Sequence, residues 1–87
     1  MLTSKEAAHL YLKDFGTNLE KLREMRGLSK SKMAEICHMD LSNYSKYEKG
    51  ENNVSTETML RFASALDMEP KDFVDFPFDK KKFKIKY

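Results

Sequence analysis

The chain has 87 residues, of which 40% are hydrophobic and 34% are charged, and its formal net charge is +2. This length is enough for one domain with a thin core, so several helices or two subunits must share that core. The single cysteine excludes an internal disulfide. The sequence has neither an apolar run long enough to cross a membrane nor a signal peptide, so we expect a cytoplasmic location and no membrane partner.

Charge is distributed unevenly along the chain. Residues 19–50 hold seven Lys/Arg and five Asp/Glu, residues 51–76 hold two and six, and residues 77–87 hold five and one. Such asymmetry is typical of a molecule that turns one face toward phosphates. For any single one of these residues, a solvated surface charge is the competing interpretation.

The first predicted element is a helix capped by Thr3, because Thr3 and Glu6 have the spacing of a capping box. An apolar stripe then runs along the chain at Ala8, Leu12, Phe15, Leu19 and Leu22. Gly16 lies inside this stripe, where it costs a helix about 1 kcal/mol relative to alanine. The pattern therefore allows two arrangements: one helix over about residues 4–26, or an extra helix ending near Asp14 and another beginning near Phe15.

Two short helices with a tight turn between them are predicted over Leu28–Gly50. Ser29 is a suitable N-cap for the first of them, and Met33, Ala34 and Cys37 form its apolar face. Before this pair, the first helix is expected to end at residues 26–28, where glycine and leucine fit a Schellman-type cap.

The second short helix follows a turn at His38 and Met39. Asp40 is expected to cap it, through acceptance by its side chain and through its charge at the positive end of the helix dipole. Gly50 is placed for a left-handed C-cap. The back of this helix carries Tyr44 and Tyr47, and its opposite, polar and basic face carries Leu41, Ser42, Ser45, Lys46 and Lys49. A helix of this kind can pack its back into a core and present its front to a nucleic-acid groove.

Two further helices are predicted after Gly50. Ser55 caps the fourth, whose core face is formed by Met59, Phe62, Ala63 and Leu66. Pro70 suits the first turn of a fifth helix, with Phe73 and Val74 facing inward, and Pro77 prevents its continuation.

The last residues change period, because Phe83, Ile85 and Tyr87 alternate with lysines. Alternation favours a strand, and lysines suit an exposed edge. Three arrangements stay open: the tail pairs across a dimer, folds back onto the acidic residues of 51–76, or is disordered and touches DNA.

The two short helices resemble the helix-turn-helix of the lambda-repressor/Cro-like (XRE) family. The residues that carry the resemblance are Leu28-Ser29, Met33-Ala34, Met39, Leu41 to Tyr47, and Glu48-Lys49-Gly50. The match extends from about Phe15 to Phe73. Two positions depart from the pattern: His38 stands where glycine is usual, and Asp40 where Ser or Thr is usual. Histidine tolerates the positive φ that this turn tends to need, whereas an acid beside phosphate is electrostatically unfavourable.

The resemblance implies an all-α fold, a compact five-helix lambda-repressor-like bundle. We place the helix-turn-helix domain at residues 15–76, an N-terminal helical extension at residues 1–14, and a basic C-terminal tail at residues 77–87. The family also implies a structural ion pair between Arg23 and Glu48, since a guanidinium suits bidentate pairing with a carboxylate. Two separate surface charges are the competing interpretation.

The function implied is a sequence-specific transcriptional regulator that binds double-stranded DNA, with residues 41–48 in the major groove. Base edges are expected to meet Leu41, Ser42, Ser45 and Lys46, and phosphates to meet Lys30, Lys32, Lys49, Asn52 and Asn53. For the two asparagines, ordinary turn chemistry competes. One such module buries only about 600–1,000 Å², so useful affinity implies a homodimer on adjacent half-sites.

A second class of function stays open: a protein-interaction module, such as an antitoxin-like partner of a toxin, with or without DNA binding. Asp40, the acidic residues of 51–76 and the two flanking extensions favour it. We expect no enzymatic activity, cofactor or metal. The sequence offers no Ser/His/acid set, metal-ligand cluster or glycine-rich loop, and His9 and His38 are far apart.

Overall fold

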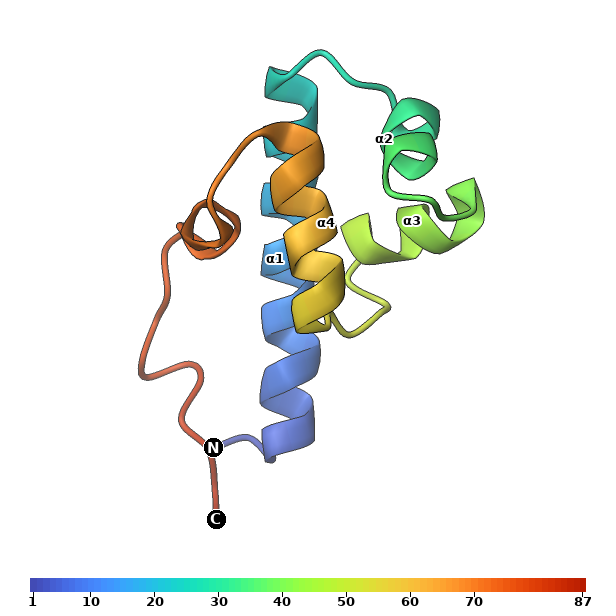
Figure 1. The fold of residues 1–87 in the computed structure, drawn as a ribbon. Coiled ribbons are helices and arrows are strands. Elements are labelled where there is room, and N and C mark those ends of the chain that lie inside the picture. The colour runs from blue at the N-terminus through green and yellow to red at the C-terminus, as the bar shows by residue number, and fades with distance from the viewer.

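The longest element is α1 (Ser4–Met25), which spans most of the height of the molecule in Figure 1. In the computed structural model, which describes residues 1–87, it is followed by α2 (Lys30–Ile36), α3 (Leu41–Glu48) and α4 (Thr56–Leu66). Of the two arrangements allowed by the sequence for the N-terminal region, the structure therefore has the single helix. None of the helices has both the length and the apolar character needed to cross a membrane.

The start of α1 is fixed by the predicted capping box. The backbone N–H of Thr3 donates to Glu6 Oε1 at 2.8 Å, and that of Glu6 donates to Thr3 Oγ1 at 3.1 Å. These two bonds satisfy amides that the helix itself leaves without partners.

Gly16 continues α1 because another helix packs against it. A Cβ added at Gly16 would lie 2.7 Å from the carbonyl oxygen of Tyr47 and closer still to that of Glu48. The missing side chain lets the C-terminal end of α3 rest directly on α1. The propensity cost of glycine is thus offset by a close helix–helix contact.

The core lies between α1, α2, α3, α4 and the segment after α4. Aromatic rings dominate its centre: Phe62 contacts Tyr44 edge-on, with 5.9 Å between ring centroids, and Phe73 at 6.4 Å. Ten buried side chains form it, namely Phe15, Leu19, Met33, Ala34, Cys37, Tyr44, Phe62, Ala63, Leu66 and Phe73.

The predicted fifth helix is wrong in type. Pro70–Val74 forms a five-residue 3-10 helix, η1, so the fold has four α-helices. Asn18 Nδ2 donates to the carbonyl oxygens of Asp72 and Phe73, both at 3.0 Å, and thereby takes up acceptors that an α-helix would use itself. Pro77 has no N–H to offer to the second of them. Phe73 is buried as expected, but Val74 is 43% exposed, so the prediction that it faces inward is also wrong.

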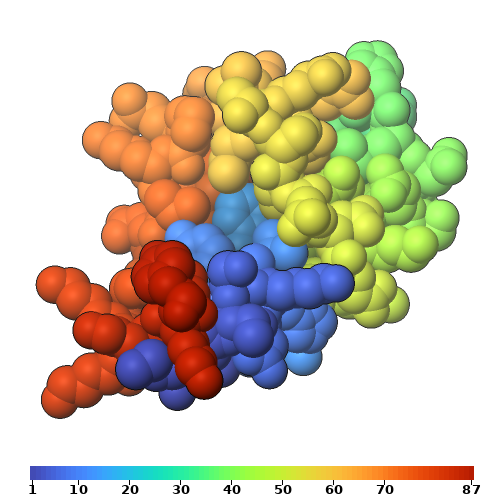
Figure 2. Space-filling view, turned by 90° about the horizontal axis from the view of Figure 1, so that it is seen from below, coloured from blue at the N-terminus to red at the C-terminus, as the bar shows by residue number.

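The C-terminal tail, residues 77–87, does not form the predicted strand. It makes one parallel bridge, between Leu2 and Ile85, in which Leu2 N donates to Lys84 O at 2.9 Å and Lys86 N to Leu2 O at 2.8 Å. Tyr11 of α1 contacts the rings of Phe76, Phe78 and Phe83, with centroid distances of 5.3, 6.0 and 6.1 Å. The tail folds back onto the N-terminal half of α1 (Figures 1 and 2), and none of its lysines forms an ion pair with an acidic residue of 51–76.

Candidate nucleic-acid interface

The start of α2 and the turn that follows α2 are built as the sequence predicts. Ser29 caps α2 by accepting from Lys32 N at 3.0 Å. His38 has a φ of 56°, which confirms the positive φ expected at this position. The Met39 N–H donates to Ala34 O at 3.0 Å, so the turn closes back onto α2. The orientation of α3 relative to α2 is therefore fixed by backbone hydrogen bonds.

Asp40 occupies the N-cap position of α3, but its side chain makes no capping hydrogen bond. The predicted side-chain acceptance is therefore wrong, and only the interaction of its charge with the helix dipole is left. The carboxylate is exposed at the start of the helix face that would approach a ligand.

The outward face of α3 is largely free. Ser42 and Lys46 are exposed, Leu41 is 47% exposed, and Ser45 is half-buried. Lys46 has no carboxylate within ion-pair distance. An apolar group, hydroxyls and an unpaired ammonium thus share one accessible surface, which suits contact with base edges in a groove.

The back of α3 is held by a buried polar network. Arg23 Nε donates to Glu48 Oε2 at 2.6 Å, and Nη2 donates to Oε1 at 3.2 Å. Arg23 Nη1 donates to Leu28 O at 2.6 Å, and the Tyr44 hydroxyl donates to Glu48 Oε2 at 2.5 Å. Arg23 and Glu48 are 6% and 8% exposed, so the structure places this bidentate pair inside the fold.

Glu48 contributes to raised pKa values of both its hydrogen-bond partners, Arg23 and Tyr44. The hydrogen bond to Glu48 is the main cause that raises the pKa of Arg23. For Tyr44, burial raises the pKa first, and the hydrogen bond to Glu48 adds to this. The carboxylate is thus the acceptor around which α1 and α3 are joined.

Stability should fall at alkaline pH because of Tyr44. Its pKa in the folded state is raised above the ordinary value of 10.0, so the neutral hydroxyl stabilises the fold fully below pH 10. As the pH rises past 10, the unfolded chain loses this proton while the folded chain keeps it, and stability decreases. At pH 11 the expected loss is about 1.4 kcal/mol. Tyr44→Phe should remove this part of the decrease in urea-unfolding free energies, whereas Tyr87→Phe, at an exposed ring, should retain it. Equal decreases in the wild type and Tyr44→Phe would contradict the assignment.

The residues predicted to meet phosphates differ in their exposure and in their present partners. Lys30 and Lys49 have no ion-pair partner, whereas Lys32 Nζ lies 3.5 Å from Glu35 Oε2, in a pair exposed on both sides. Asn53 is exposed. Asn52 Nδ2 donates to Asn43 Oδ1 at 3.0 Å, which ties the loop after α3 to the helix.

Two residues with clear structural roles were missed by sequence reasoning. Tyr44 was counted only as an apolar residue, although Tyr44 and Glu48 are spaced i, i+4 on one helix, a spacing that brings side chains together. Asn18 holds η1, and no local pattern marks it, because its partners are far away in the sequence. The bulk of Tyr11 indicates that it packs against the domain or a second subunit, and in the structure it packs against the tail.

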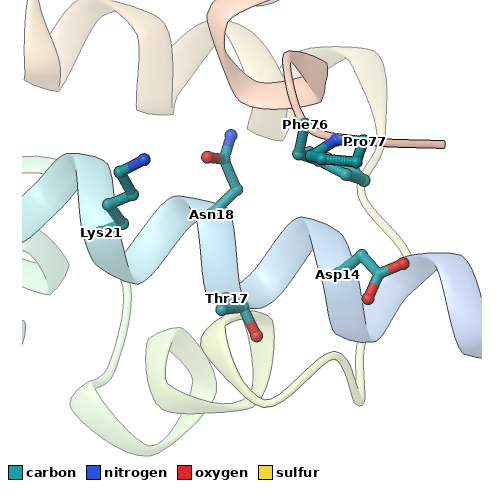
Figure 3. Close-up of a pocket in the computed structure, with 6 residues that line it drawn as sticks. All are labelled: Asp14, Thr17, Asn18, Lys21, Phe76 and Pro77. Atoms are coloured by element: carbon teal, nitrogen blue, oxygen red, sulfur yellow. The ribbon is translucent and has the colours of Figure 1, made fainter.

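One surface hollow lies between α1 and the start of the tail (Figure 3). Asn18 points from α1 toward η1, and its amide is already engaged by the carbonyl oxygens there. The hollow is therefore explained by the attachment of η1 to α1. It is lined by Asp14, Thr17, Asn18, Lys21, Phe76 and Pro77.

Comparison with known proteins agrees with this geometry. Residues 19–73 match the helix-turn-helix family. The C.BamHI control protein of Bacillus amyloliquefaciens is 32% identical over 63 residues, covering 71% of this chain and 78% of that protein. An HTH-type transcriptional regulatory protein of Pyrococcus abyssi is 33% identical over 66 residues, covering 76% of this chain. The chain spans only 21% of the length of this archaeal relative.

Solved structures with the same arrangement include a restriction-modification controller protein. C.AhdI from Aeromonas hydrophila is 39% identical with a TM-score of 0.69, covering 71% of this chain and 94% of that one. The clp gene regulator ClgR from C. glutamicum, at 23% identity and a TM-score of 0.70, shares the fold over 74% of this chain and 83% of its own. These matches show that the chain belongs to the XRE-type helix-turn-helix family of transcriptional regulators.

Proposed function

We propose that this chain is a sequence-specific transcriptional regulator that inserts α3 into the major groove of double-stranded DNA. The observation that carries the proposal is the combination of a free outward face on α3 with a back fixed by the buried Arg23–Glu48 pair. A recognition helix must present its side chains in one orientation, because each base contact depends on hydrogen-bond geometry. Membership of the helix-turn-helix family supports the same conclusion.

Specific contacts follow from position on α3. Ser42 and Lys46 are the main candidates for base edges, Lys46 as a donor to guanine O6 or N7, with Leu41 against a thymine methyl group. Ser45 contributes at the margin of the face, because it is half-buried. Each good contact is worth about 1–3 kcal/mol of discrimination.

Phosphate contacts are assigned to the free cations and amides at the rim. Lys30 at the start of α2 and Lys49 after α3 are unpaired, and Asn53 is exposed in the following loop. Lys32 would first have to leave Glu35, a surface pair worth little. Asn52 would donate to phosphate through its backbone N–H or through the N–H of its amide that Asn43 does not engage.

The regulator would act as a homodimer. One module of this kind buries about 600–1,000 Å² on DNA, which is too little for tight binding alone. Candidate interface residues lie away from α3: Leu60 on α4 is 55% exposed, Val74 on η1 is 43% exposed, and a surface hollow joins Leu60 to Ile36. The N-terminal extension and the tail are the alternative dimer surfaces.

Selection of bound sequences from a random duplex pool tests this function. We expect enrichment of a palindrome whose half-sites lie about one helical turn apart. Ser42→Ala and Lys46→Ala should relax the preference at particular positions, at about 1–3 kcal/mol each. Lys30→Ala should weaken all sequences equally and reduce the salt slope of the homodimer by about 1.8, about 0.9 for each protomer. Lys21→Ala, on α1 at the hollow that Phe76 and Pro77 also line, is the matched control and should change neither property. If no sequence were enriched at low salt, the proposal would be abandoned.

A protein-interaction module, such as an antitoxin-like partner of a toxin, is the second candidate. It is favoured by Asp40, whose carboxylate is exposed and makes no capping bond at the front of α3. An acidic group at this place opposes approach to phosphate. Absence of sequence enrichment, together with tight binding of a protein to the α3 face, would favour this alternative.

A further inference from the structure

The tail carries a group of lysines that the helix-turn-helix does not use. All are exposed, and none lies within ion-pair distance of a carboxylate. Lys82 makes a cation–π contact, in which its Nζ lies 5.5 Å from the ring centroid of Phe83. The residues of this tail patch are Lys80, Lys81, Lys82, Lys84 and Lys86.

The tail patch is held in place from behind. Phe83 and Ile85 are half-buried and alternate with the exposed lysines, so one side of the tail is apolar and the other is cationic. Phe83 stacks on Phe78, with 4.8 Å between ring centroids, and both contact Tyr11. Two backbone hydrogen bonds between Leu2 and the residues on either side of Ile85 fix the end of the tail. The ammonium groups are therefore presented by an anchored segment, which lowers the entropic cost of binding a ligand.

A continuous surface leads from the loop after α3 to this patch. Asn53 and Gly50 line one surface hollow together with Lys5 and His9 of α1. Lys5 and His9 also line the next hollow with Leu2, which is bonded to Lys84 and Lys86. Seen from below, the start of α1 lies between the tail and the α3–α4 region on one face of the molecule (Figure 2). From Leu12, where Gly50 packs, to the start of α1 is about 12 Å, at 1.5 Å per residue.

We propose that the tail patch is a second phosphate-binding surface, which contacts the DNA backbone outside the half-site read by α3. This inference rests on the proposed DNA-binding function. Lysine is a compact point charge that suits phosphate without reading sequence. Successive phosphates of one strand are about 3.4 Å apart along the axis, so with α1 lying along the DNA a 12 Å offset corresponds to roughly four base pairs. The tail would therefore add affinity and salt dependence without altering the sequence preference.

Two duplexes separate this inference from the proposed function. Both carry the palindrome selected from the random pool; the short one ends at the half-sites, and the long one adds about ten base pairs on each side, one helical turn. The test variant combines Lys80→Gln, Lys81→Gln, Lys82→Gln, Lys84→Gln and Lys86→Gln. The matched control replaces the same five lysines by arginine, which keeps the charge. These side chains are exposed and make no ion pairs, and only the contact of Lys82 with Phe83 is lost in the glutamine variant, so both variants should unfold within about 5 °C of the wild type.

Dissociation constants measured between 50 and 200 mM salt give the result. With two tail contacts, the wild type should have a salt slope steeper by about 1.8 on the long duplex than on the short one, about a tenfold difference over this range. The glutamine variant should lose this extra slope, the arginine variant should keep it, and all three should bind the short duplex alike. Equal salt slopes for the wild type and the glutamine variant on the long duplex would overturn the inference. An acidic protein surface would then be the favoured partner of the patch. If the wild type bound neither duplex specifically, the proposed function would fall as well.

Discussion

Glu48→Ala should lower the free energy of unfolding by about 3–5 kcal/mol, the cost of stranding the buried guanidinium of Arg23. Glu48 receives two hydrogen bonds from Arg23 and one from Tyr44, at distances of 2.5–3.2 Å. Both members of the ion pair are less than 9% exposed, so water cannot replace the lost carboxylate. Urea unfolding followed by circular dichroism measures the loss.

The chain provides its own control for this prediction. Lys32 and Glu35 form an ion pair at 3.5 Å in which both side chains are more than half exposed, so Glu35→Ala should change stability by no more than about 0.5 kcal/mol. Replacing both buried partners, with Arg23→Met and Glu48→Leu, should recover most of the loss, because no charge is then left unpaired. If Glu48→Ala cost no more than Glu35→Ala, the network could not be what joins α3 to α1.

The same network explains an effect expected on DNA. Lys46 is unpaired and Leu41 is exposed, so neither side chain fixes the orientation of α3. The orientation depends on the turn after α2 and on the bonds behind α3, from Glu48 to α1 and from Tyr44 to Glu48. A partly folded Glu48 variant should therefore lose sequence preference before it loses helix content, because base contacts depend on angle as well as distance.

Local signals predicted the helix ends well. Thr3, Ser29 and Ser55 cap α1, α2 and α4 through side-chain bonds to the third backbone amide that follows. Each of these caps depends on residues only three positions apart, so the sequence contains all the information required. The exception is Asp40, whose position was predicted correctly but whose side-chain bond is absent.

Features that depend on distant partners could not be predicted in the same way. Pro70–Val74 looks like the start of an α-helix, but Asn18, more than fifty residues earlier, takes up its carbonyl oxygens. The alternating tail suggests a strand, but a strand needs a neighbouring strand to pair with. In the structure the tail makes a single bridge, to Leu2. The tail is placed by contacts of Tyr11 with the rings of Phe78 and Phe83, which are too far away in the sequence for a periodic pattern to connect them with Tyr11.

Gly50→Ala should cost clearly more stability than Gly27→Ala. Gly50 has a φ of 73°, and a Cβ there would lie 2.7 Å from the carbonyl oxygen of Leu12 and from the backbone of Lys13. The left-handed conformation costs a residue with a side chain about 1–2 kcal/mol. The clash adds about 1–3 kcal/mol, because the atoms in the way belong to the backbone of α1 and cannot rotate aside.

Gly27 is the matched comparison. It has nearly the same φ, 70°, but nothing lies within 4 Å of the position of its Cβ. Gly27→Ala should therefore cost only the conformational term, about 1–2 kcal/mol. The difference between the two alanine variants in urea unfolding isolates the close approach of the α3–α4 loop to α1. Equal losses would mean that the loop moves away from α1 at little cost.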